Sequence, residues 1–334
     1  MTTSTQHLFR RSAAQPLPQV VRAEGVWIET EDGRRYLDGS AGALVASIGH
    51  GVREVVEAQA RQAGAAAYIH GTHFGVAAQE ELAARLAAMA PADLDRVYPV
   101  SGGSEANETA IKFARQLHLE RGDRERHLTI GRDVSYHGNT LGALAVSGHA
   151  ARRRPYRPLL RDQPHIPPAY CYRCPFGLEH PGCGVRCAEE LEAEIKRTGP
   201  QYIAAFIAEP VVGAAGGALV PPPEYFPIIR DICDRYEVLF IADEVMTGIG
   251  RTGRRFAVEH WDVVPDVITT GKGVGGGYAP LGAMIVREPH FQAIAQGSGA
   301  FVHGFTYGGH PPSAAAGAAV LAYVEEHGLI DRAA

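Results

Sequence analysis

The chain has 334 residues, a length that accommodates one large domain and part of a second. Hydrophobic residues make up 46% of it and charged residues 21%, the balance of an ordinary globular protein. The net charge is −5, with 32 basic and 37 acidic residues and no basic block, so nucleic-acid binding is not expected. No apolar run has the length of a membrane span, and no hydrophobic segment follows Arg10 and Arg11 to form a secretory signal. We therefore expect a cytoplasmic protein without membrane partners.

The first part of the chain predicts a small, partly extended region. Residues 1 to about 20 are polar and predict an arm, and residues 26–38 predict a hairpin that turns at Asp32-Gly33. Two amphipathic helices follow, the second with one apolar face formed by Leu82, Leu86 and Met89.

From about residue 97, short apolar runs alternate with helical patterns. The clearest runs are 202–208, 238–242 and 263–269, and Cys233 lies on the apolar side of a helical pattern, where we expect a core residue. Strands that alternate with helices predict a mainly parallel sheet covered on both faces. In such a sheet, ligands bind at the carboxyl ends of the strands.

Two reactive side chains follow apolar runs at this predicted edge. Asp243 ends the run that begins at Phe240, and Lys272 lies between two glycines after the run 263–269. A lysine and an aspartate in these places suit pyridoxal phosphate (PLP), because the amine forms a Schiff base with the cofactor aldehyde and the carboxylate pairs with the pyridinium nitrogen. Taken singly, the lysine is typical of a solvated loop and the aspartate of a helix cap.

Two glycine-containing segments require separate interpretations. Residues 101–108 (SGGSEANE) follow a strand-like run at 97–100 and open a helix, so their bare N–H groups predict phosphate binding; the alternative is a serine-capped helix without a ligand. Residues 271–276 match the dinucleotide pattern G-x-G-x-x-G, but Pro280 stands where that pattern requires a helix. We reject the dinucleotide interpretation.

Seven segments, in this order along the chain, carry a resemblance to a known family. They are Tyr36-Leu37-Asp38-Gly39, Ser101 to Ala106, Ser135-Tyr136-His137-Gly138, Ala208-Glu209-Pro210, Asp243 to Gly253, Thr270-Gly271-Lys272-Gly273 and Thr306 to Pro311. With them the chain resembles a class III (ornithine/ω-amino acid type) PLP-dependent aminotransferase of fold type I. The resemblance implies an α/β fold: a large domain with a mainly parallel sheet and helices on both faces, plus a partial small domain.

The resemblance also implies domain boundaries. Residues 1–58 belong to the small domain, 59–310 form the PLP-binding domain, and 311–334 begin a connecting helix. Because family members continue into a C-terminal lobe, we expect that lobe to be absent from this chain.

The roles of individual residues follow from the resemblance. Lys272 carries the cofactor and then moves a proton, and Asp243 keeps the pyridine nitrogen protonated. Tyr136 and Val245 cover the two ring faces, and Glu209 lies near the phenolic oxygen or acts as a gate. The remaining cofactor residues are His137 and the phosphate-binding residues Gly103, Ser104 and Thr306, the last supplied by the neighbouring subunit of a homodimer with shared active sites.

The implied activity is transfer of an amino group to a 2-oxo acid by a ping-pong mechanism. The segment after Glu209 lacks the Gln-Gly-Glu-Gly sequence of branches that use 2-oxoglutarate, and Met246 replaces a common glutamine. Both features favour an amine or ω-amino acid donor with a pyruvate-like acceptor. Two alternatives stay open: a decarboxylase, aminomutase or epimerase on the same scaffold, and a non-catalytic, PLP-binding dimerisation remnant.

Four of the five cysteines are clustered in a proline- and glycine-rich insertion, residues 167–190. Cys171, Cys174, Cys183 and Cys187 form two close pairs, which could bind a structural zinc ion, although the spacer is shorter than is usual in zinc ribbons. The alternatives are two disulfides or free thiols. In each case we expect a surface feature that takes no part in catalysis.

Overall fold

The computed structural model describes residues 7–9, 11 and 17–334. Within these residues seven strands form the main sheet, in the order β4-β10-β9-β8-β7-β5-β6. In chain order the strands are β4 (Leu94–Val100), β5 (Leu128–Arg132), β6 (His165–Ile166), β7 (Ile203–Ala208), β8 (Leu239–Asp243), β9 (Val267–Thr270) and β10 (Gly282–Arg287). Strands β9, β8, β7, β5 and β6 are parallel neighbours, whereas β10 is antiparallel to both β9 and β4. The sheet is therefore mainly parallel, as predicted, with an antiparallel edge.

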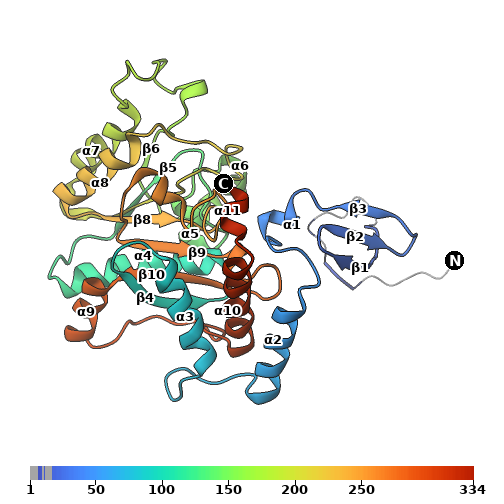
Figure 1. Ribbon diagram of the computed structural model, residues 1–334. Coiled ribbons are helices and arrows are strands. Elements are labelled where there is room, and N and C mark those ends of the chain that lie inside the picture. The colour runs from blue at the N-terminus through green and yellow to red at the C-terminus, as the bar shows by residue number, and fades with distance from the viewer. Residues whose placement is uncertain (1–6, 10, 12–16) are drawn as a thin grey trace.

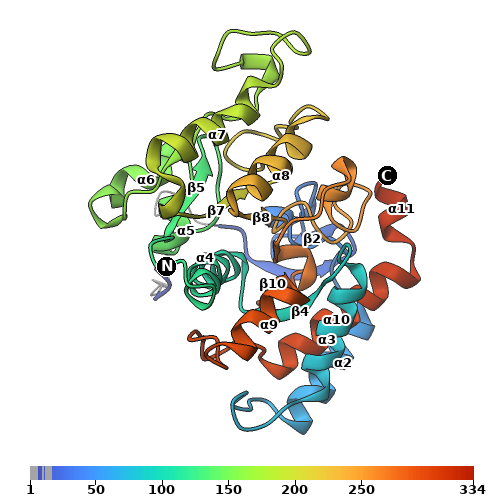
Figure 2. The same ribbon diagram turned by 90° about the vertical axis from the view of Figure 1, so that its left-hand side faces the viewer.

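Strand residues alternate between two apolar cores, one on each face of the sheet. Phe206 and Phe240 join a core that includes residues of α3 (Ala77–Met89), α7 (Arg186–Thr198), α8 (Tyr225–Tyr236) and α10 (Pro311–Glu326). Ile207 and Ile241 face the opposite core, built with α4 (Gly103–Glu120) and α9 (Glu288–Gln296). Figure 2 shows helices covering the central strands on both sides. This arrangement brings the strand ends to a common edge.

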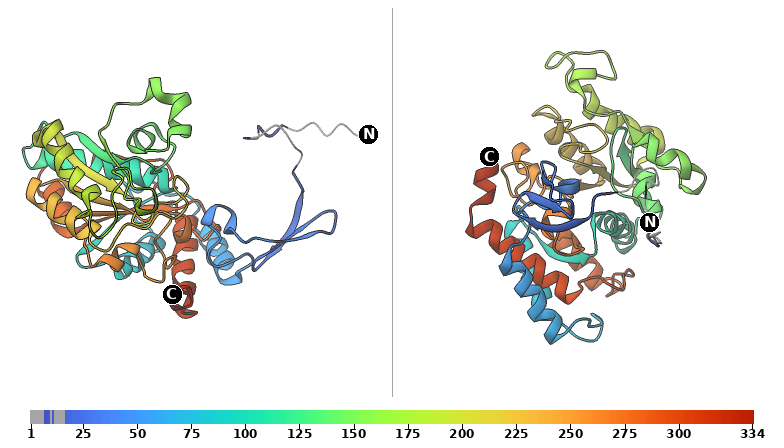
Figure 3. Two further views of the ribbon diagram at one scale, coloured as in Figure 1. Left: turned by 90° about the horizontal axis from the view of Figure 1, so that it is seen from above. Right: turned by 90° about the vertical axis from the view of Figure 1, so that its right-hand side faces the viewer.

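A second, smaller sheet stands apart from the main body. It contains β1 (Val20–Glu24), β2 (Trp27–Thr30) and β3 (Arg35–Leu37) in antiparallel order. The short α1 (Ala41–Leu44) and the longer α2 (Arg53–Ala65) connect it to the body (Figure 1), and from above the sheet projects outward (Figure 3). The remaining short helices are α5 (Leu141–Val146), α6 (Ala150–Arg153) and α11 (Leu329–Ala333).

The predicted elements match the structure unevenly. The hairpin turn at Asp32-Gly33 is confirmed, but β1 replaces the end of the predicted arm; the rest of the arm falls mostly outside the described residues. The run 263–269 is strand only from Val267, because Pro265 lacks the N–H of a central strand and Asp266 turns its carboxylate to the Phe240 amide. Cys233 is buried in the core, as predicted, and burial raises its pKa to about 12.

None of the helices in the described part of the chain is both long and apolar enough to cross a bilayer.

Candidate active site

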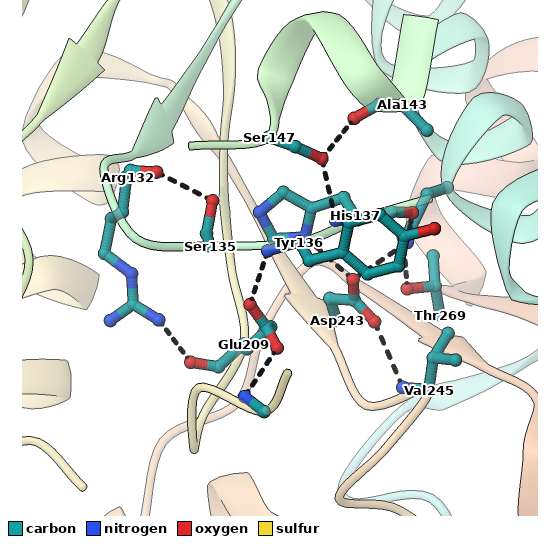
Figure 4. Close-up of polar contacts among 12 residues, drawn as sticks. Arg132, Ser135, Tyr136, His137, Ala143, Ser147, Glu209, Asp243, Val245 and Thr269 are labelled. Carbon is teal, nitrogen blue, oxygen red and sulfur yellow. Dashed lines mark hydrogen bonds and ion pairs between the residues drawn. The ribbon is translucent and has the colours of Figure 1, made fainter. Parts of the chain in front are cut away.

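Asp243 ends β8 with its side chain almost completely buried, at 3% exposure. Its Oδ2 lies 2.8 Å from Asn107 Nδ2 and 2.7 Å from His137 Nδ1, and its Oδ1 accepts the Val245 N–H at 3.1 Å (Figure 4). Since a carboxylate oxygen accepts two hydrogen bonds, Oδ1 keeps one acceptor position beyond the Val245 contact. A buried carboxylate in this setting is suited to pair with a cationic nitrogen.

Asn107 is the residue of this cluster that the sequence analysis missed. It lies in the early part of α4, fully buried, and its Nδ2 also donates to the backbone oxygen of His137 at 2.6 Å. Its Oδ1 accepts a hydrogen bond from Thr269 Oγ1 at 2.6 Å. A signal was present in the sequence, because Asn107 stands one helical turn before Ala110 on the apolar face of the helix. A polar residue on such a face requires buried partners.

The loop after β5 presents Tyr136 and His137. The His137 N–H donates to Ser147 Oγ at 2.8 Å, which fixes the backbone beside Asp243 (Figure 4). The Tyr136 ring is half-buried, and the Arg152 guanidinium lies 4.1 Å from its centroid. Buried His137 Nε2 has no hydrogen-bond partner among the described residues. Because the Asp243 carboxylate only accepts hydrogen bonds, His137 Nδ1 is the donor in this contact.

Glu209 follows β7 and connects two loops. Its Oε1 accepts the Tyr136 N–H at 2.8 Å and its Oε2 accepts the Gly213 N–H at 2.9 Å. Burial raises the pKa of Glu209; the charge of His137 opposes this increase, and the negative charge of Asp243 adds to it. Both carboxylate oxygens therefore hold backbone beside the candidate ring site.

The first turn of α4 provides the anion-binding end of the site. The first N–H groups of a helix lack intrahelical partners, and Gly103 and Ser104 occupy these positions. A β-carbon on Gly103 would lie 2.5 Å from Val245 Cγ1, so only glycine fits here without a shift. Ser104 Oγ accepts the N–H of Asn139 at 3.1 Å. This loop offers backbone donors at the carboxyl edge of the sheet.

Lys272 follows β9 in a single turn of 3₁₀ helix. Asp243 and Thr269 are register partners on β8 and β9, so Lys272 is three residues beyond the partner of the aspartate. Gly271 packs against the glycine loop at the start of α4, because a β-carbon on Gly271 would lie 3.2 Å from the Gly103 nitrogen. Lys272 is half-buried with φ 40°, a left-handed conformation that is strained for a non-glycine residue. Among the described residues, Lys272 forms no salt bridge.

Thr306 lies in an exposed loop between α9 and α10 rather than in the cluster around Asp243. His303 anchors this loop. Its backbone oxygen accepts a hydrogen bond from the Tyr98 hydroxyl at 3.1 Å, and its Nε2 lies 2.9 Å from Thr109 Oγ1. The side chain of Thr306 forms no hydrogen bond with any residue that the structure describes.

The zinc alternative for the cysteine insertion is not supported. The four cysteines are free and line one small cavity, but in the part of the chain that the structure covers no three His, Cys, Asp or Glu side chains are arranged to hold a metal ion. Burial, and after it the neighbouring cysteines, raise the pKa of Cys187 to about 11. Of the alternatives stated above, free thiols agree with the structure. The insertion projects beyond α7 (Figure 2).

The residues at the edge of the sheet fit pyridoxal phosphate in three respects. Asp243 Oδ1 offers an acceptor position for a protonated ring nitrogen, and the glycine loop offers N–H donors for a phosphate. Lys272, which carries the amine, directly follows Gly271, the residue packed against that loop. The dinucleotide alternative remains excluded, because a single turn and then β10 follow residues 271–276 where a helix would be required.

Comparisons with known proteins agree with this chemistry. A model of the family described as aminotransferase class-III matches residues 8–334. The uncharacterized aminotransferase YodT of Bacillus subtilis is 44% identical over 326 residues, which cover 98% of this chain and 73% of the relative. The putrescine–pyruvate aminotransferase of Pseudomonas aeruginosa is 36% identical over 315 residues, covering 94% of this chain and 68% of the relative.

A solved structure extends the similarity to the fold. The crystal structure of a thermostable (S)-enantioselective omega-transaminase from Thermomicrobium roseum has a TM-score of 0.92 and 39% identity. The match covers 98% of this chain and 74% of that protein.

Proposed function

Because the chain belongs to the class-III aminotransferases, a family of fold type I enzymes that use pyridoxal phosphate, we propose that it moves an amino group from an amine or ω-amino acid to a pyruvate-like 2-oxo acid. The observation that carries the proposal is the convergence of Asp243, Lys272 and the glycine loop at one edge of the sheet. The substrate preference is supported by the sequence after Glu209 and by similarity to a putrescine–pyruvate aminotransferase.

In this proposal the cofactor is held at both ends. Gly103 and Ser104 bind the phosphate through the start of α4, and Lys272 binds the cofactor covalently. Tyr136 and Val245 cover the ring faces, as the family resemblance implies. When bound, pyridoxal phosphate supplies an electron sink for the carbon that loses its proton.

Asp243 keeps a protonated ring nitrogen in place. Its three donors are the Asn107 amide, the His137 imidazole and the Val245 N–H. The amide and the backbone N–H carry no charge, so they stabilise the carboxylate without cancelling its charge. The charge of Asp243 therefore remains available to a cation at Oδ1.

Lys272 carries the proton transfer. Once the donor amine has taken its place on the cofactor, the free Nζ of Lys272 would accept the proton from the amine-bearing carbon of the donor, and in the second half-reaction it would deliver a proton to the carbonyl carbon of the acceptor. Glu209, bonded to Tyr136 and Gly213, keeps the loop beside the ring in place. His137 acts through Asp243 rather than on the substrate.

The proposed assembly is a homodimer in which the exposed Thr306 of one subunit contacts the phosphate held by the other. We assign residues 59–310 to the cofactor-binding domain, residues 1–58 to the smaller one and residues 311–334 to the start of a connecting helix; α10 packs against both α2 and α3. A cytoplasmic location is also part of the proposal, supported by five cysteines that form no disulfide.

The test is amino transfer with purified protein. Wild-type protein loaded with pyridoxal phosphate is mixed with putrescine or another amine donor and pyruvate, and alanine is measured. Lys272→Ala serves as the control and should form no alanine. Release of carbon dioxide from amino acid substrates without alanine formation would instead indicate a decarboxylase.

A further inference from the structure

The side chain of Asn107 connects four segments of the candidate site. It originates on α4, whose start binds phosphate, and contacts Asp243 at the end of β8. It also contacts the backbone of His137 in the loop after β5, and Thr269 on β9, the strand that leads to Lys272. All of these contacts are buried, and their donor–acceptor distances lie between 2.6 and 2.8 Å.

The orientation of this amide is determined by its neighbours. The His137 carbonyl and Asp243 Oδ2 are acceptors, so both must face the NH₂ group of Asn107. Oδ1 then faces the Thr269 hydroxyl, which donates to it. A flipped amide would set its oxygen against these two acceptors, whereas the Thr269 hydroxyl, which can donate or accept, would tolerate either orientation. The side chain therefore uses both of its N–H donors and its oxygen in one arrangement.

We propose that Asn107 is a positioning residue that holds the Asp243 carboxylate aimed at the cofactor ring nitrogen, with Thr269 holding the oxygen of its amide. This inference rests on the proposed function. Asn107 acts on the cofactor only through Asp243. Its contribution is an N–H donor that never carries a charge, so it stabilises the carboxylate at every pH at which the protein folds.

Asn107→Asp is the informative variant, because it replaces the amide with a group of the same shape that titrates. When protonated, the new carboxyl can donate one hydrogen bond to Asp243, as the amide does. When ionised, it sets a second negative charge at hydrogen-bond distance from Asp243, and the two carboxylates share one proton between them. Asn107→Leu removes the donor at every pH.

The titratable groups that face this cluster come from several elements. His137 lies on the loop after β5, Glu209 follows β7, Glu244 follows Asp243 on β8, and Lys272 follows β9. From α4 itself, Glu105 is bonded to the Ser101 N–H and Glu108 to the hydroxyl of Thr140. These groups are unchanged in the variants, so the difference between variant and wild-type pH profiles isolates position 107.

The experiment measures pyridoxal phosphate affinity by fluorescence titration of cofactor-free protein from about pH 5 to about pH 9. At the alkaline end, Asn107→Asp should bind roughly tenfold to a hundredfold more weakly than wild type, in line with losing a hydrogen bond to a buried charge. Its affinity should approach that of wild type as the pH falls. Asn107→Leu should bind weakly throughout, with a profile parallel to wild type.

Two variants at position 269 keep the test decisive if Asn107→Asp does not fold. Thr269→Val removes the hydroxyl that holds the amide oxygen and should weaken binding, whereas Thr269→Ser retains it and should restore binding to within about twofold of wild type. Equal affinity of the Val and Ser variants would overturn the role of Thr269, and parallel pH profiles of wild type and Asn107→Asp would overturn the role of Asn107. If wild-type protein bound pyridoxal phosphate without attachment to Lys272, the proposed function itself would fail.

Discussion

The backbone of Gly103 lies so close to Val245 that a β-carbon on the glycine would sit 2.5 Å from Val245 Cγ1. This contact joins the start of α4 to the residue whose N–H binds Asp243. The phosphate end and the ring-nitrogen end of the candidate site are therefore packed directly against each other, and disturbing one should disturb the other.

Gly103→Ala tests that packing. The added methyl group cannot be accommodated without moving Val245, so we expect a loss of roughly 1–3 kcal/mol in the free energy of unfolding and weaker binding of pyridoxal phosphate. The neighbouring Gly102→Ala is a matched control, since its φ of 173° is extended backbone and its added methyl meets nothing within 4 Å. Urea unfolding and cofactor titration of both variants measure the effect. If Gly103→Ala and Gly102→Ala had equal free energies of unfolding and equal cofactor affinities, the packing of Gly103 against Val245 would not have the predicted effect.

Glu244→Gln tests a buried carboxyl one residue beyond Asp243. Glu244 accepts the Val258 N–H at 2.9 Å and a hydrogen bond from Thr247, and burial raises its pKa to about 7 from an ordinary 4.5. The folded protein thus binds this proton more tightly than the unfolded chain does. The contribution of this bound proton to the free energy of unfolding is fully present below about pH 4.5. It is lost as the pH rises toward 7, by up to about 3 kcal/mol.

We expect the Gln variant to remove this decline, because it stays uncharged across the same range. Urea unfolding of wild type and variant at about pH 5 and about pH 7.5 gives the comparison. The exposed Glu326→Gln changes the net charge equally and should leave the decline in place. An unchanged pH dependence in Glu244→Gln would contradict the assignment.

Asp266→Asn tests a buried network remote from the candidate chemistry. The carboxylate accepts hydrogen bonds from Arg230 and the Phe240 amide, both at 2.8 Å, and lies 3.0 Å from His290 Nε2. Burial on its own would raise the pKa of Asp266, but these donors outweigh it and hold the pKa below its ordinary value. The contribution to stability is therefore present above that ordinary value and lost as the pH falls below it.

Because the substitution leaves Arg230 with one fewer buried partner, it should cost about 3 kcal/mol in the free energy of unfolding at neutral pH. Asp234→Asn breaks the other ion pair of Arg230, at 2.7 Å with Asp234 66% exposed, and should cost less than about 1 kcal/mol. A comparable loss in both variants would show that burial does not distinguish the two pairs.

Mixing two inactive subunits tests the shared active site. Lys272→Ala lacks the proposed attachment point, and Thr306→Glu places a negative charge where the partner's phosphate is proposed to bind. If the active sites are shared, a heterodimer of the two has one intact site. A random mixture should then recover about a quarter of wild-type activity after refolding together. No recovery, or a monomer by ultracentrifugation, would contradict the shared site.

The sequence predicted the parts of the fold that have strong local signals. Buried parallel strands such as 203–208 read as continuous apolar runs, and Asp32-Gly33 specifies its turn. Strand β10 was missed because residues 282–287 follow a glycine-rich stretch that gives no helix or strand period, and its antiparallel pairing with β4 joins residues almost two hundred positions apart. Pairing at that distance is a property of the tertiary structure.

The same limit applies to the candidate site. Asp243 and Lys272 could be recognised because each follows a strand in a recognisable motif. Asn107 could not be assigned a partner, since its contacts with Asp243 and Thr269 exist only once α4 packs across β8 and β9. The zinc alternative was suggested by the two close cysteine pairs, but sequence spacing does not specify how the four thiols are oriented in the folded insertion.

The most direct test of the account is identification of the lysine that carries the cofactor. Wild-type protein is incubated with pyridoxal phosphate, reduced with borohydride, digested and analysed by mass spectrometry. We predict that the reduced cofactor is found on Lys272, and that Lys272→Ala carries none while unfolding at a similar temperature. Stoichiometric labelling of Lys112 or Lys196 in place of Lys272 would contradict the central claim.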